Sequence, residues 1–126
     1  MDITPALPAG RQLVESYGDG RFKVSGTLHQ GSILLHPEET LPWSAADMAG
    51  VTLDSLAPLL SAAGRSIEVL LLGCGPSLIP VPKDLRQGLK AQGIVIKPMD
   101  TGAACRTYNV LLLEERAVAA ALIAVG

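Results

Sequence analysis

The chain has 126 residues, of which 48% are hydrophobic, and such a length and composition fit one domain with a buried core. A formal net charge of −2 provides no field that would gather phosphates, and an aromatic content of 3% leaves few rings on which bases could stack. We therefore expect one domain over residues 1–126 that does not bind nucleic acid and starts with a loose leader, residues 1–10.

The leader holds an acid and two prolines where a signal peptide would have a basic and then an apolar region. The longest apolar run, AVAAALIAVG, is about half of the roughly 20 residues that span a bilayer. We therefore expect a cytoplasmic protein that does not insert into a membrane. A cytoplasm would keep Cys74 and Cys105 as free thiols.

A hairpin is predicted around the turn tripeptide Gly18-Asp19-Gly20, whose residues tolerate positive φ angles. In its second arm Phe22 and Val24 alternate with polar residues, so one face of that arm is buried and the other is exposed. The run SILLH then predicts a third strand, which Pro37 ends.

Leucines at helical spacing predict a helix that ends at a Gly64 cap. Pro58 is tolerated in a first helical turn, so we expect the regular part to begin near Asp54 or Ser55. The apolar run IEVLLLG, residues 67–73, then predicts a strand that is covered on both faces.

A second helix is predicted from Pro82, with Gly93 as its stop, and IVIK, residues 94–97, predicts another buried strand. A third helix should begin at Asp100, which can cap the first free N–H groups, and run to about Leu113. The final run has alanines that favour a helix, but its lack of a polar face equally fits a central strand.

The alternation of strands and helices in the second half predicts crossovers and a mostly parallel sheet. The hairpin half must add antiparallel strands. The predicted fold class is therefore α/β: a single three-layer domain whose mixed sheet has an antiparallel N-terminal part and a mostly parallel C-terminal part flanked by helices.

A glycine-rich turn, Gly73-Cys74-Gly75, follows a buried strand at the sheet edge where open α/β sheets bind ligands. A dinucleotide fingerprint would need a third glycine and an immediate helix, but position 78 is Leu78. We interpret the turn as a tight exit from the strand. The alternative is a small-ligand or enzymatic site where this turn meets the start of the Asp100 helix.

Cys105 lies near a helix N-terminus beside Arg106, and both features lower a thiol pKa. Both histidines, His29 and His36, belong to the β half, so no base is expected to reach the thiol. We interpret Cys105 as a buried small hydrophobe. The spacing of histidines, cysteines and acids predicts no catalytic triad, no metal site and no cofactor.

The remaining polar residues of the predicted third helix have two interpretations. Arg106 and Asn109 lie one turn apart beside an apolar side that includes Tyr108. Arg106 could bind a carboxylate or a phosphate in a cleft, or it could pair with Asp100 or Glu114 or cap a neighbouring strand end. The structural role is favoured, because arginine pairs and amide caps are common in α/β interiors.

A basic stripe is predicted on the second helix, where Lys83, Arg86 and Lys90 share one face. A solvated helix face would explain it. Charged residues make up only 17% of the chain, so the stripe is also a candidate for docking an acidic partner.

The chain resembles a known family in the run from Met99 to Asn109, in Glu115, Arg116 and the alanine-rich tail, and in YGDGRFKVSG and GSILLHPEETLPW. The family is that of the mitochondrial complex I assembly factor three and the adipogenesis-associated Mth938 domain protein, with bacterial members of unknown function. Cys74 departs from the small hydroxyl residue that is usual in the family. The matching positions are Gly73, Gly75, Asp100, Cys105, Arg106, Thr107, Tyr108 and Asn109.

The resemblance implies an Mth938-like α/β domain with a final strand over residues 118–124. It implies a helper in assembling a membrane-bound respiratory complex, or in protein export, and not an enzyme. We therefore expect a non-enzymatic interaction domain whose partner is a protein, such as a membrane-complex subunit or an export component.

Overall fold

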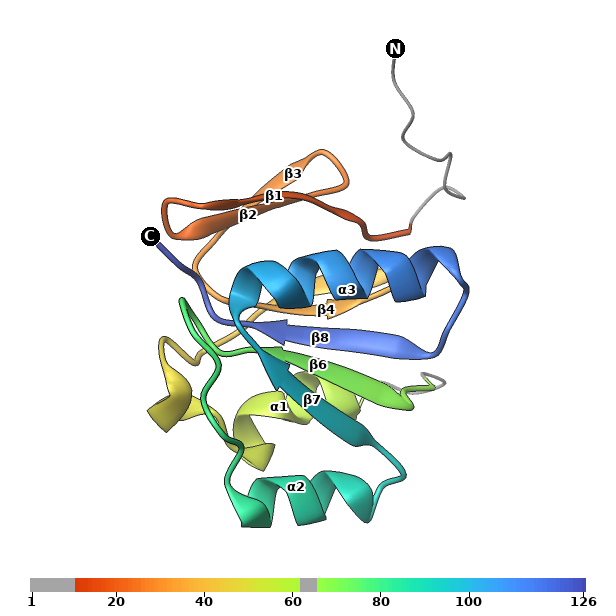
Figure 1. The fold of residues 1–126 in the computed structure, drawn as a ribbon. Helices are drawn as coiled ribbons and strands as arrows, with labels where there is room; N and C mark the ends of the chain where they lie inside the picture. The colour runs from red at the N-terminus through yellow and green to blue at the C-terminus, as the bar shows by residue number, and fades with distance from the viewer. Residues whose placement is uncertain (1–10, 62–65) are drawn as a thin grey trace.

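The computed structural model describes residues 11–61 and 66–126, so the expected leader, residues 1–10, and the expected Gly64 cap lie outside the described residues (Figure 1). The described residues form two sheets and three α-helices. The small sheet has the order β1-β2-β3 and the large sheet the order β5-β4-β8-β6-β7. The α/β class and the combination of antiparallel and parallel strands are confirmed, while the hairpin strands form a sheet of their own.

The small sheet is antiparallel and consists of β1 (Val14–Gly18), β2 (Arg21–Val24) and β3 (Thr27–Gln30). The predicted Gly18-Asp19-Gly20 turn joins β1 to β2, and all three of its residues have positive φ. The strand β3 is absent from the sequence prediction, because three of its four side chains are exposed and carry no apolar alternation.

The antiparallel side of the large sheet consists of β4 (Ile33–His36), β5 (Glu39–Pro42) and β8 (Val118–Leu122). Its parallel side pairs β6 (Val69–Gly73) with β8 and with β7 (Val95–Met99). The final apolar segment is a central strand, as the resemblance implied. The expectation that IVIK is a buried strand is wrong for two of its four side chains: β7 is an edge strand, Ile94 and Ile96 are buried, and Val95 and Lys97 are exposed.

Helices cover both faces of the large sheet, which gives three layers (Figure 1). One face packs against α1 (Leu53–Leu60) and α2 (Lys83–Lys90). The other face packs against α3 (Thr101–Leu113) and the inner side of the small sheet. A short 3₁₀ helix, Met48–Gly50, precedes α1.

The start of α1 differs slightly from the prediction. Thr52 and Ser55 form a reciprocal capping box, so the helix begins at Leu53, and Pro58 lies in its second turn. The bounds of the other two helices agree more closely with the prediction. The helix α2 follows Pro82, and α3 follows an Asp100 cap and ends at Leu113.

Candidate functional site

The predicted glycine turn and the start of α3 do lie together. The hydroxyl of Thr101, which is fully buried, accepts a hydrogen bond from Gly75 N–H (3.0 Å) and donates one to the carbonyl of Ile123 (2.8 Å). The N–H of Thr101 donates to the carbonyl of Gly75 (2.8 Å). A Cβ on Gly73 would lie 3.1 Å from the Cα of Thr101, so this glycine permits the close approach.

These contacts use the backbone groups that a ligand at this edge would need. Cys74 N–H donates to the carbonyl of Met99 (2.8 Å), and Gly75 N–H is held by Thr101. The carboxylate of Asp100 accepts from Ala103 N–H (2.9 Å), as its predicted capping role requires. The turn and the helix start therefore stabilise each other, and their geometry favours a structural role.

The polar residues in the middle of α3 attach strand β1 to the helix. The Asn109 side chain accepts a hydrogen bond from Val14 N–H (3.0 Å) and donates one to the carbonyl of Val14 (2.8 Å). The hydroxyl of Tyr108, a fully buried residue, donates to the carbonyl of Gln12 (2.9 Å). Burial also raises the pKa of Tyr108, so its hydroxyl stays protonated.

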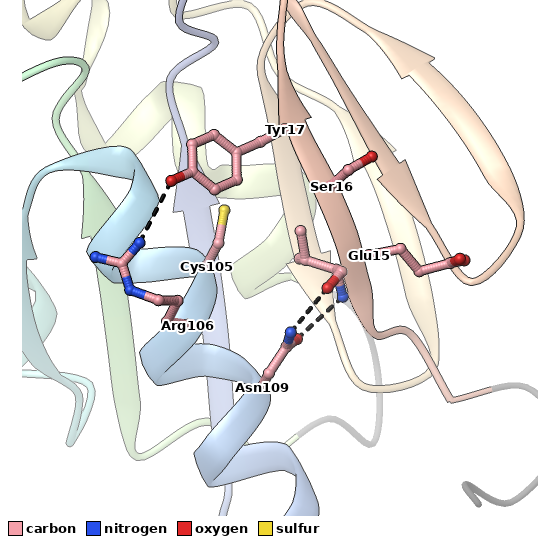
Figure 2. Close-up of a pocket in the computed structure, with 7 residues that line it drawn as sticks. Glu15, Ser16, Tyr17, Cys105, Arg106 and Asn109 are labelled. Atoms are coloured by element: carbon pink, nitrogen blue, oxygen red, sulfur yellow. Dashed lines mark hydrogen bonds between the residues drawn. The ribbon is translucent and has the colours of Figure 1, made fainter. Parts of the chain in front are cut away.

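A hollow of about 350 Å³ lies between β1 and α3 (Figure 2). Its lining is Val14, Glu15, Ser16, Tyr17, Cys105, Arg106 and Asn109. At one end the guanidinium of Arg106 donates to the hydroxyl of Tyr17 (Nη1 to Oη, 3.3 Å). At the other end the Asn109 amide bonds to Val14. This hollow brings together three of the predicted site residues: Cys105, Arg106 and Asn109.

Burial governs the chemistry of Cys105, which is 2% exposed. Desolvation raises its pKa from the ordinary 9.0 to about 12, although the positive charge of Arg106 acts in the opposite direction. Asp100 adds to the increase. The thiol is therefore neutral at physiological pH, and the arrangement does not provide an activated nucleophile.

The other predicted site residues lie apart from the hollow. Gly73 ends β6 and Gly75 lies in the turn after it, Asp100 caps the adjacent start of α3, and Thr107 is partly buried outside the lining. The described residues contain no group of three His, Cys, Asp or Glu side chains that could hold a metal ion.

The basic stripe is exposed on α2, as predicted, at Lys83, Arg86 and Lys90. It is not purely a solvated face, because Arg86 donates to the carbonyl of Ile96 in the edge strand β7 (Nη1 to O, 3.4 Å).

Sequence reasoning missed Tyr17, Thr101 and Gly102 as parts of this region. A Cβ on Gly102 would lie 2.3 Å from the hydroxyl oxygen of Tyr17, so the ring occupies the space that a side chain would fill. A glycine inside a helix costs stability relative to alanine, so a glycine at such a position indicates that another group packs closely against the helix. Gly102 is therefore the sequence signal that could have indicated the close approach of Tyr17 to α3.

Residues 14–123 match the family described as "Protein of unknown function (DUF498/DUF598)". A zebrafish relative, NADH dehydrogenase [ubiquinone] 1 alpha subcomplex assembly factor 3, is 32% identical over 88% of this chain. The match covers 63% of that protein, so this chain spans less than two thirds of the length of the assembly factor.

Two solved bacterial structures share the fold. A Bartonella henselae protein, described as an outer membrane protein, has a TM-score of 0.84 and 39% identity, covering 93% of this chain and 98% of that one. A Bordetella pertussis protein described as an Mth938-like domain has a TM-score of 0.80 and 28% identity, covering 98% and 92%. Within the two described segments of this chain, no helix is both long and apolar enough to cross a membrane.

Proposed function

This chain belongs to the DUF498/DUF598 family of proteins of unknown function, and we propose that it is a non-enzymatic interaction domain that helps to assemble a multi-subunit protein complex. The observation that carries the proposal is its similarity to complex I assembly factor 3, which extends over 88% of the chain. A shared fold alone would not support a shared role, but 32% identity over nearly the whole domain does.

The geometry of α3 supports a binding role better than a catalytic one. Its most reactive group, the Cys105 thiol, is buried and neutral. The amide of Asn109 and the hydroxyl of Tyr108 are engaged in attaching β1. A catalyst needs a nucleophile or a base that reaches its substrate, and none of these three groups meets that requirement.

The proposed partner is a protein, with a subunit of a membrane-bound respiratory complex as the first candidate and an export component as the second. The proposed compartment is the cytoplasm, where two free, buried cysteines such as Cys74 and Cys105 would remain reduced. Fractionation of the host cell with an antibody against this chain tests the compartment. Recovery in the periplasmic or outer-membrane fraction would contradict it, whereas recovery with the inner membrane would agree with binding to a membrane-bound complex from the cytoplasmic side.

Deletion of the gene tests the assembly role. We expect the deletion strain to contain less assembled NADH dehydrogenase complex on a native gel, and we expect plasmid-borne wild type to restore it. A strain with normal amounts of the complex and with defective protein export would favour the second partner class. A strain with neither defect would contradict the proposed function.

A further inference from the structure

We propose that the hollow between β1 and α3 receives a carboxylate side chain, an aspartate or a glutamate, from the protein partner. The inference rests on the proposed function and adds the chemistry by which the partner is recognised. It depends on three features of the hollow: its size, the charge at its rim and the character of its walls.

The hollow has room for one side chain rather than for a strand. Two contacts mark its ends, the Arg106–Tyr17 hydrogen bond and the Asn109–Val14 pair (Figure 2). The volume of about 350 Å³ is near the lower limit of roughly 300–1,000 Å³ for small-ligand pockets. An added strand could not pair with Val14, because the Asn109 amide already occupies the N–H and the carbonyl of that residue.

The charge at the rim favours an anion. Arg106 is exposed and carries five N–H donors, and in the described part of the chain its guanidinium has no carboxylate partner. Its one hydrogen bond there goes to the neutral hydroxyl of Tyr17. An incoming carboxylate could accept from the guanidinium and from the Tyr17 hydroxyl together, and such charge-assisted bonds are among the stronger ones in proteins.

The two nearby acidic side chains are engaged elsewhere. Glu15 points away from the hollow, toward Lys23 (Oε2 to Nζ, 4.0 Å) and Gly26 N–H (Figure 2). Asp100 caps the first turn of α3 through Ala103 N–H. Neither carboxylate therefore neutralises Arg106 by direct pairing.

The walls suit the carbon atoms of an acidic side chain. Val14 and Cys105 are buried and border the hollow, and the thiol is neutral and so does not repel a carboxylate. Arginine and tyrosine are also among the residue types that most often carry binding energy at protein interfaces. One acidic side chain inserted beside Arg106 and Tyr17 would therefore act as an anchor for a larger contact.

An NMR titration with a side-chain mimic tests the site. The probes are N-acetyl-glutamate amide and its neutral isostere N-acetyl-glutamine amide, each added to the ¹⁵N-labelled chain up to roughly 50 mM. We expect saturable shifts at the residues that line the hollow with the glutamate probe only. Arg106→Gln should weaken this binding about tenfold or more, and Tyr17→Phe should weaken it less, because it removes one hydroxyl and keeps the ring.

Arg116→Gln is the matched control, since it removes the same charge from an exposed arginine that lies outside the lining of the hollow, and it should leave the titration unchanged. Equal responses to the two probes, shifts confined to α2, or no response would each overturn the proposal. Should Arg106→Gln fail to fold, Tyr17→Phe decides the result. The titration contains no subunit of the complex, so a negative result would overturn the carboxylate site and not the assembly role. The deletion strain tests the assembly role separately.

Discussion

The side-chain amide of Asn109 occupies both backbone hydrogen-bonding groups of Val14, with the N–H at 3.0 Å from Oδ1 and the carbonyl at 2.8 Å from Nδ2. A side chain thus takes the place of a neighbouring strand at the outer edge of β1. The polar run on α3, for which the sequence left a binding role open, therefore serves first to attach the small sheet to α3.

Replacement of Asn109 should release β1. We expect Asn109→Ala to lower the free energy of unfolding by roughly 1–3 kcal/mol, because it leaves two partly buried backbone groups of Val14 unpaired. Asn109→Asp should also destabilise, since a carboxylate cannot donate to the Val14 carbonyl. Urea denaturation measures both, with the exposed Val110→Ala as control. Equal stability of Asn109→Ala and the control would contradict the attachment.

Thr101 offers a sharper test of the turn at Gly75. Thr101→Val keeps the shape but leaves Gly75 N–H and the Ile123 carbonyl without their hydroxyl partner, and we expect a loss of roughly 2–4 kcal/mol. Thr101→Ser keeps the hydroxyl and should retain most of the stability. Thermal unfolding followed by circular dichroism compares the two. A serine variant as unstable as the valine variant would argue that the methyl group matters instead.

The regular elements of the second half could be predicted because their signals are local. The Asp100 cap defines the start of α3, and the apolar run before Gly73 is long enough to indicate a buried strand. The strands Thr27–Gln30 and Glu39–Pro42 are four residues each and largely lack buried apolar side chains, so only their tertiary pairing identifies them.

The candidate site was predictable only in part, because its halves lie far apart in the chain. Cys105, Arg106 and Asn109 are close in sequence and share a helix, which the spacing could indicate. Their partner Tyr17 is 89 residues from Arg106, and no local pattern connects the two. The strand β7 was misjudged for a similar reason, since an apolar IVIK run does not reveal that its outer side lacks a neighbouring strand.

Cys105 should react slowly in the folded protein. In a Cys74→Ala background, we expect iodoacetamide at neutral pH to label Cys105 slowly before unfolding and rapidly in urea, because the native thiol is buried and protonated. Mass spectrometry of timed samples measures both rates. Fast labelling of the native protein would show that the thiol is accessible and would reopen a chemical role for it.

Stability should decrease at alkaline pH. The folded state retains protons on Cys105 and Tyr108 that the unfolded chain releases above about pH 9 and 10, so the free energy of unfolding falls as pH rises from about 9 toward 12. Each group contributes at most about 1.4 kcal/mol per pH unit. Urea denaturation from pH 7 to 11 should show a smaller decrease for Cys105→Ala. An identical decrease would mean that the thiol does not titrate as proposed.

The central claim is that this domain assists assembly by binding and not by catalysis. The most direct test is to identify the proteins that migrate with the chain during native electrophoresis. A tagged chain can be followed in host extracts by native electrophoresis, with mass spectrometry of each gel slice. We predict that the chain migrates in near-stoichiometric amounts with an incomplete NADH dehydrogenase intermediate, and that it is absent from the finished complex. Migration of the chain only at the size of free protein, in cells that are actively assembling the complex, would contradict the claim.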